Sequence, residues 1–396
     1  MRVTQSLSQA QFLAAIGTLQ SNLNQTQNQL SSSQQFTTAS QNPIAAGSVN
    51  NYQQTLAQSQ QYGTNSNSAH TNLSTEDNVL SQVQTQLQAL RTLALQANSG
   101  TLSNTNRSAI ATQAVQIQNS LLALANTQNG NGEYIFGGFA SQTQPFTLSA
   151  AGATYNGDQG QRQVQIAAGQ TVADGDNGNT VFNQIKTGNG TFAVTAIAGN
   201  SGSGIVGATT VSNPAAYDGG TYSITFTAPG AYQVTKGGAP VTTGTYADGG
   251  TIAFNGVQVT LSGQPATGDS FSLAASTNQS LFTTVQNLVS ALQTGVSGPA
   301  SSASLNNSIN SSINNIDQAL SQSSNVRATI GGRLNSITTQ QSVATATQTQ
   351  LTQSISTLQS LDFAAALTTL TQQNTTLSAA LQAFTLTQGL SLFKFL

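Results

Sequence analysis

Residues 363–396 read FAAALTTLTQQNTTLSAALQAFTLTQGLSLFKFL, and the apolar side chains in this run recur in steps of four and three. Such a heptad repeat predicts a helix that buries one narrow stripe against another helix. Asn374 fills a slot of the repeat, and most of the remaining surface is Thr, Gln and Ser, so nothing inside the segment can cover the stripe. The stripe consists of Phe363, Leu367, Leu370, Leu377, Leu381 and Phe384.

A matching stripe lies near the other end of the chain. Apolar residues at helical spacing belong more often to an ordinary core than to an intermolecular contact. Here, however, both ends are poor in charge and apolar on a thin strip only, which is a weak basis for a closed monomer core. The sequence therefore predicts that the two terminal helices meet and carry an assembly interface. The N-terminal stripe consists of Phe12, Ile16, Leu19, Leu23 and Leu30, with Thr26 in the gap.

The composition limits the class of protein. With 396 residues and 37% hydrophobic content, the chain is long enough for two or three domains and a sizeable core. Charged residues make up only 5%, against about a quarter in ordinary soluble domains, so the surface tolerates close packing against copies of itself. The net charge of −2 argues against nucleic acid as a partner.

Compartment signals are few. The chain has no cysteine, which excludes disulfides and thiolate metal sites. It has no apolar run of about 18 residues, so we expect no membrane partner. The N-terminal run MRVTQSLSQAQFLAAIG lacks a continuous apolar segment and a small-residue cleavage site, so no cleaved secretory signal is expected. A cytoplasmic protein, or one exported with an uncleaved N-terminus, fits these features.

Helical and β patterns alternate along the chain. Helical periodicity over residues 73–97 and 110–124 predicts two long antiparallel helices, and it returns after residue 276. Between residues 130 and 273, glycines concentrate and short alternating runs predict an all-β region, with Asn255-Gly256 as a hairpin turn. Gly331-Gly332 interrupts the last helical pattern, which suggests a bend or a close helix approach.

The fold class we expect is mainly α with an inserted all-β region. Residues 1–45 with 350–396 would form a terminal coiled-coil assembly region, in which the N- and C-terminal helices pair. Residues 46–180 with 276–349 would form a helical rod domain with a β hairpin near 131–172. Residues 181–275 would form an outer β domain at the far end, with an aromatic core of Tyr222, Phe226, Tyr232, Tyr246, Phe254 and Phe271.

Signals for catalysis or metal binding are nearly absent. The single histidine, His70, lies in a polar stretch and is assigned to the surface. Residues 174–179, DGDNGN, resemble a calcium loop but place Ile185 where the EF-hand needs a glutamate, so an Asp/Asn/Gly turn is the better interpretation. Glu76 and Asp77 are neighbours that point to different helix faces. We expect no catalytic residue, no cofactor and no metal.

Six runs in the chain form a recognisable set: MRVT at residues 1–4, QNPIAA at 41–46, LRTLALQANSG at 90–100, EYIFGG at 133–138, RATIGGRLN at 327–335 and SLFKFL at 391–396. Together these runs resemble the flagellin superfamily, and within it the hook-associated junction proteins of type 3. One departure is that Gln41-Asn42 stands where that family has an acidic pair, which puts a salt-bridge account of subunit contacts in doubt.

This resemblance implies a structural role rather than an enzyme. Members of the family look like rod-shaped subunits whose terminal helices pair in an inner coiled-coil layer, with the β domain outermost. They are exported unfolded by the flagellar type III apparatus and joined between hook and filament. The partners implied are other copies in a ring, a hook-side junction protein, filament flagellin, and a cytoplasmic export chaperone on the C-terminal helix. The location implied is the secreted flagellum.

Three alternatives remain open from the sequence. A filament flagellin is the nearest, although the opening and closing residues disfavour it. A surface adhesin or fibre protein shares the polar, Gly-rich β composition but gives no reason for matched terminal heptads. A glycan-cleaving enzyme would need a carboxylate pair in the β region, where the aspartates lie in turn-like contexts next to glycine. These aspartates are Asp158, Asp218, Asp248 and Asp269.

Overall fold

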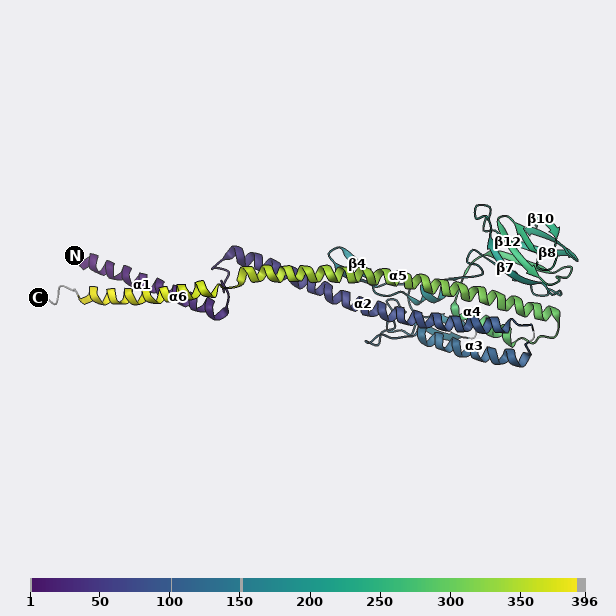
Figure 1. The fold of residues 1–396 in the computed structure, drawn as a ribbon, viewed down its shortest axis with the longest axis horizontal. Helices are drawn as coiled ribbons and strands as arrows, with labels where there is room; N and C mark the ends of the chain where they lie inside the picture. Colours follow the sequence, from purple (N-terminus) through teal and green to yellow (C-terminus); the bar gives the residue numbers. More distant parts are fainter. Residues whose placement is uncertain (1, 101, 150–151, 390–396) are drawn as a thin grey trace. The chain divides into compact units, whose positions relative to one another are not determined.

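The computed structural model describes residues 2–100, 102–149 and 152–389. Within these ranges, helices occupy both ends of the sequence and strands occupy its middle, as the sequence predicts (Figure 1). The chain separates into two compact units. The first combines Met1–Thr64 with Gln340–Leu396, and the second is Asn65–Thr339. Among the described residues, no helix is apolar enough over a sufficient length to cross a membrane.

Two long helices run through both units: α2 (Pro43–Ala97) and α5 (Pro299–Gln359). Each begins with proline, whose fixed φ suits the first helical turn, where its missing N–H is not needed. The sequence suggests a bend or a close helix approach at Gly331-Gly332, and the structure shows no close approach there. Helix α5 continues through both glycines, which are exposed and have no neighbouring atom where a Cβ would lie.

In the second unit, the two long helices pack with α3 (Asn104–Ala125) and α4 (Leu281–Gln293) around one apolar core. Two ion pairs of opposite polarity help to fix the antiparallel register of α2 and α5. Arg91 contacts Asp317 at 2.6 Å, and Asp77 contacts Arg327 at 2.8 Å. Fully buried side chains of α2 include Leu73, Leu80, Leu87, Leu90 and Ala94.

The segment after α3 packs onto this helical core. It forms two hairpins, β1–β2 (Phe146–Ser149, Gly152–Tyr155) and β3–β4 (Gln163–Ala167, Gln170–Ala173), followed by a π-helical turn η1 (Asn179–Asn183). Four buried aromatic rings tie the segment to α4, with centroids between 5.0 and 6.2 Å apart. The rings belong to Phe136, Phe146, Phe182 and Phe282.

A separate β domain is inserted between η1 and α4, and its entry and exit pair as β5 (Ile185–Lys186) and β14 (Asn278–Gln279). It contains a five-stranded sheet, β10-β9-β8-β13-β6, and a three-stranded sheet, β11-β12-β7, all antiparallel. The strands are β6 (Phe192–Ala196), β7 (Ile205–Val211), β8 (Tyr222–Ala228), β9 (Ala231–Lys236), β10 (Ala239–Thr245), β11 (Thr251–Phe254), β12 (Val257–Ser262) and β13 (Ser270–Ala275).

The core of the β domain is distinct from that of the helices. The predicted aromatic residues take part in it, with Tyr222, Phe226 and Phe271 almost fully buried and Tyr232 partly buried against them. The predicted hairpin is also present: Asn255 and Gly256 link β11 to β12 with φ of 41° and 77°. Two successive positive φ angles are what a two-residue hairpin turn requires.

Candidate assembly surface

The first unit has a short joint between α1 and α2. Helix α1 (Arg2–Ser32) ends before Ser33, whose φ of 58° is left-handed, and Gln34 then pairs with Ser360 in an antiparallel bridge. A small apolar cluster closes the joint, made of the buried Phe36, Ala45 and Val49 with partly buried side chains from α5. This joint connects the two terminal helices of the unit.

The Gln41-Asn42 pair has a local role without charge. The Asn42 Oδ1 accepts the backbone N–H of Ala45 at 3.1 Å, which caps the start of α2. The Gln41 Oε1 accepts the backbone N–H of Thr37 at 2.7 Å and so closes the preceding turn. The two amides thus supply the hydrogen-bond acceptors that this turn needs.

Helices α1 and α6 (Phe363–Gly389) lie antiparallel and in contact within the first unit (Figure 1). The rings of Phe12 and Phe384 stack with centroids 5.4 Å apart and planes 15° from parallel. The α1 stripe lies along this contact as a regular heptad series. Leu23 and Thr26 are buried, while Phe12, Ile16, Leu19 and Leu30 are half-buried.

The α6 stripe divides into two lines. Leu370, Leu377 and Phe384 are half-buried, and the residues that continue their line are the buried Ala366 and the half-buried Gln373 and Ala380. Three predicted side chains of α6 stay exposed: Phe363 at 54%, Leu367 at 54% and Leu381 at 46%. Leu367 and Leu381 fall on an adjacent line, and Phe363 lies at the start of α6, one heptad before Leu370. We call these three exposed side chains the open line of α6. The structure therefore brings only half of the predicted α6 residues against α1.

Two exposed leucines of α1 were not among the predicted residues. Leu7 and Leu13 are 59% and 52% exposed. Both lie off the heptad positions of the stripe, so a search for one periodic seam passes over them. A search for large apolar residues on an otherwise polar helix would have found them.

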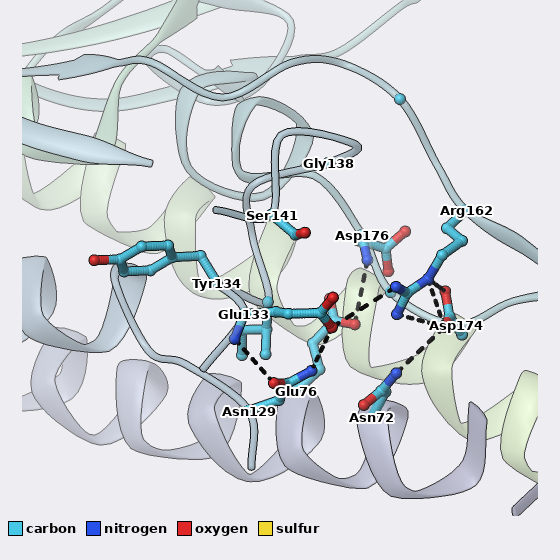
Figure 2. A pocket seen from close by; sticks show the side chains of 13 residues that line it. Asn72, Glu76, Asn129, Glu133, Tyr134, Gly138, Ser141, Arg162, Asp174 and Asp176 are labelled. Atoms are coloured by element: carbon cyan, nitrogen blue, oxygen red, sulfur yellow. Dashed lines mark hydrogen bonds and ion pairs between the residues drawn. The ribbon is translucent and has the colours of Figure 1, made fainter. Parts of the chain in front are cut away.

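Buried charge gathers at a second place, between α2 and the segment 129–176, which we call the Glu76 cluster (Figure 2). Asp174 forms an ion pair with Arg162 at 2.7 Å, and Asp176 forms one with Arg333 at 2.9 Å. Burial, followed by the charge of Asp176, raises the pKa of Glu76 well above its ordinary value. The sequence predicts an Asp/Asn/Gly turn at DGDNGN, and in the structure both of its aspartates are buried in ion pairs with arginines.

The four aspartates considered as catalytic candidates have local structural roles. Asp158 accepts the backbone N–H groups of Phe139 and Gly160, which hold its pKa below the ordinary value. Asp269 accepts three backbone N–H groups, and Asp218 and Asp248 each accept one. In the part of the chain that the structure describes, no group of three or more His, Cys, Asp or Glu could hold a metal ion.

Two segments of the chain match known families, and both families are flagellar. Residues 3–141 match the bacterial flagellin N-terminal helical region, and residues 195–275 match the D2-like domain of flagellar hook-associated protein 1. Together with paired terminal helices and an inserted antiparallel β region, these matches define a flagellin-type protein.

Individual relatives show which family within the flagellin-type class the chain resembles. Flagellar hook-associated protein 3 of Salmonella typhimurium is 32% identical over 187 residues, which are 47% of this chain and 58% of that protein. The chain is similar to Xanthomonas campestris FlgL, at 34% identity and a TM-score of 0.73, over 77% of this chain and 99% of that one. It is also similar to the flagellar junction protein FlgL of Legionella pneumophila, at 33% identity and 0.67, over 72% and 98%. The chain belongs to the family of flagellar hook-associated protein 3.

Proposed function

We propose that this protein is a structural adaptor subunit of the bacterial flagellum that joins the hook to the filament. Its family membership supports this role, because a relative of which it covers 98% is described as a flagellar junction protein. The observation that carries the proposal is the open line of α6, three large apolar side chains exposed on a helix that already has an intrachain partner. A helix with two apolar lines fits an inner layer in which each helix contacts more than one neighbour.

In this proposal the eleven stripe residues form two groups, one that pairs within a subunit and one that contacts neighbouring subunits. Phe12, Ile16, Leu19, Leu23 and Leu30 pair with Leu370, Leu377 and Phe384 inside one subunit. Phe363, Leu367 and Leu381 remain for neighbouring subunits. Their burial would offset the entropy lost when the ends become ordered.

The partners follow from this role. We expect other copies of the chain in a ring, the hook-side junction protein on one side and filament flagellin on the other. We further expect export in an unfolded state through the flagellar type III apparatus, with a cytoplasmic chaperone on the C-terminal helix beforehand. Residues 1–45 with 350–396 would be the assembly region, 46–180 with 276–349 the helical rod domain with its hairpin near 131–172, and 181–275 the outer β domain.

The first prediction tests the open line directly. Leu381→Asp places a charge among the residues proposed to be buried only on assembly, where an unpaired charge costs several kcal/mol. Leu381 is already 46% exposed in the single chain, so the variant should be secreted and fold normally. We expect the fraction of hooks that carry filaments, counted by electron microscopy, to fall at least about tenfold.

Two further variants make the test specific. Gln372→Asp adds the same charge at an exposed position on the far side of α6 and should leave joining unchanged. Leu377→Asp lies on the line that contacts α1 and should impair both joining and the helix pair. Normal joining by secreted Leu381→Asp or Leu377→Asp would refute the proposal. Growth of long filaments from the purified protein alone would instead indicate a filament flagellin.

A further inference from the structure

The Glu76 cluster concentrates charge in a chain that has little of it. The protein has nine basic and eleven acidic residues, and five of these twenty line one cavity of about 40 Å³ beside α2. Figure 2 shows their side chains converging from α2 and from the 129–176 segment. The five are Glu76, Glu133, Arg162, Asp174 and Asp176.

Each aspartate of the cluster has strong partners. Asp174 accepts hydrogen bonds from the Arg162 guanidinium and from the Asn72 amide, the latter at 3.2 Å. Asp176 accepts two from the Arg333 guanidinium, at 2.9 and 3.0 Å, and one from Gln161 at 2.7 Å. The charge of each aspartate is therefore balanced by one guanidinium.

Glu76 differs from these aspartates. Its side chain is 1% exposed, and its Oε2 accepts the backbone N–H of Asp176 at 3.2 Å. Among the described residues, its Oε1 has no hydrogen-bond partner. Glu76 lines the 40 Å³ cavity, which is large enough to admit a water molecule.

The balance of charge around Glu76 favours its neutral form. Four carboxyl groups face two guanidinium groups, and both guanidinium groups are already engaged by aspartates. The other side chains of the cavity wall, among them Tyr134 and Asn129, bring no further positive charge. An ionised Glu76 would be an uncompensated charge in a buried site.

We propose that the Glu76 cluster is a proton-holding latch. The Asp176 N–H joins the Asp174–Asp176 segment to the Glu76 carboxyl group of α2. While Glu76 is neutral, this segment stays packed on α2. Loss of the proton adds an unpaired negative charge beside Asp176 in a buried site, and that repulsion and desolvation cost loosen the segment. No covalent bond changes, because the proton passes between Glu76 and water. Burial, which raises the pKa of Glu76, is consistent with this arrangement.

The sign of the pH dependence follows from linkage. The folded chain holds the Glu76 proton more tightly than the unfolded chain, whose glutamate has an ordinary pKa near 4.5. Stability is therefore fully present below that pH. As pH rises from there to the folded pKa, the folding equilibrium constant falls by up to tenfold per pH unit for this one group.

The protonation of Glu76 can be followed by itself, because Glu76 and Glu133 are the only glutamates in the sequence. Selective carboxyl-¹³C labelling of glutamate therefore gives two NMR signals, and Glu133→Gln assigns them by removing one. We expect the Glu76 signal to titrate at higher pH in the folded chain than in the urea-unfolded chain. Titration at the same or lower pH would overturn the latch.

Stability measurements give an independent test. Glu76→Gln mimics the neutral acid, so it should remove the decline of stability between the two pKa values, whereas Glu133→Gln should retain it. An unchanged decline in Glu76→Gln would contradict the proposal. So would a rise in stability on adding sodium, potassium or calcium chloride that is specific to one cation, because a bound cation would then hold Glu76 ionised. If Glu76→Gln fails to fold, the titration of the natural chain decides.

Discussion

Gly138 shows how a single residue positions an exposed aromatic ring. Its φ is +66°, and a Cβ there would overlap the Asp158 carboxylate and lie 2.7 Å from the Asp158 carbonyl oxygen. That carboxylate accepts the Phe139 N–H at 2.9 Å. Phe139, 67% exposed, is thus held on a fixed backbone rather than on a mobile loop.

Comparing two glycines separates crowding from backbone strain. Gly132 has a similar φ of +79° but nothing near the position of a Cβ. Gly132→Ala should cost about 1 kcal/mol in the free energy of unfolding, which is the left-handed penalty alone. Gly138→Ala should cost about 2–4 kcal/mol, since it adds the clash with Asp158. Chemical denaturation measures both, and equal costs would contradict this account of the turn.

The sequence predicted residue roles where the cause is local. Neighbouring glycines predict turns at four aspartates, and each of them accepts at least one backbone N–H in the structure: Asp158, Asp218, Asp248 and Asp269. The pairing of Asp176 with Arg333 could not be predicted. These residues are 157 positions apart, and no local pattern links them.

At the scale of elements, the heptad pattern of α1 predicts the buried face of its helix better than the pattern of α6 does. The α1 stripe has one heptad phase, and its residues are buried or half-buried, with Phe12 stacked on Phe384 of α6. The α6 sequence carries two overlapping phases that share Leu370, Leu377 and Phe384. Apolar periodicity does not show which of the two phases faces α1. The line that faces α1 is completed by Ala366, Gln373 and Ala380, and these small or polar residues give no apolar signal in the sequence. The packing against α1 makes that choice.

The contact between the β domain and α5 could not be predicted from the sequence either. β7 is an edge strand, and its exposed backbone groups are met by amide side chains of the helix. The Asn307 Oδ1 accepts the Val206 N–H at 2.7 Å, and its Nδ2 donates to the Gly204 carbonyl at 2.9 Å. Asn310 donates to the Val206 carbonyl at 2.9 Å. Asparagines thus take the place of a neighbouring strand.

Removing one amide should loosen this edge and leave the helix intact. Asn307→Ala leaves the Val206 N–H and the Gly204 carbonyl without their partner, so local opening should become about 1–3 kcal/mol easier. Hydrogen exchange of the Val206 amide reports this directly. Ser308→Ala is the matched control, because the Ser308 hydroxyl donates only to Ser304 within the helix. Unchanged exchange at Val206 in Asn307→Ala would mean that the sheet holds this edge unaided.

At the scale of the whole molecule, the order of helices, strands and helices was predicted from the sequence, as was the pairing of the terminal helices. Stability is distributed unevenly between the units. The second unit has two large apolar cores, whereas in the first unit the buried apolar residues of α1 and α6 are few, chiefly Leu23 and Ala366. Low burial implies low resistance to local opening. We therefore expect the terminal helices to open far more readily than residues 65–339.

Limited proteolysis of the purified monomer, with mass spectrometry of the surviving core, tests the central claim that the ends are completed only by neighbouring subunits. We expect early loss of roughly forty residues from each end while residues 65–339 persist. The same ends should resist cleavage once the subunit is assembled between hook and filament. A monomer protected from end to end would contradict the account, because α1 and α6 would then need no partner beyond each other.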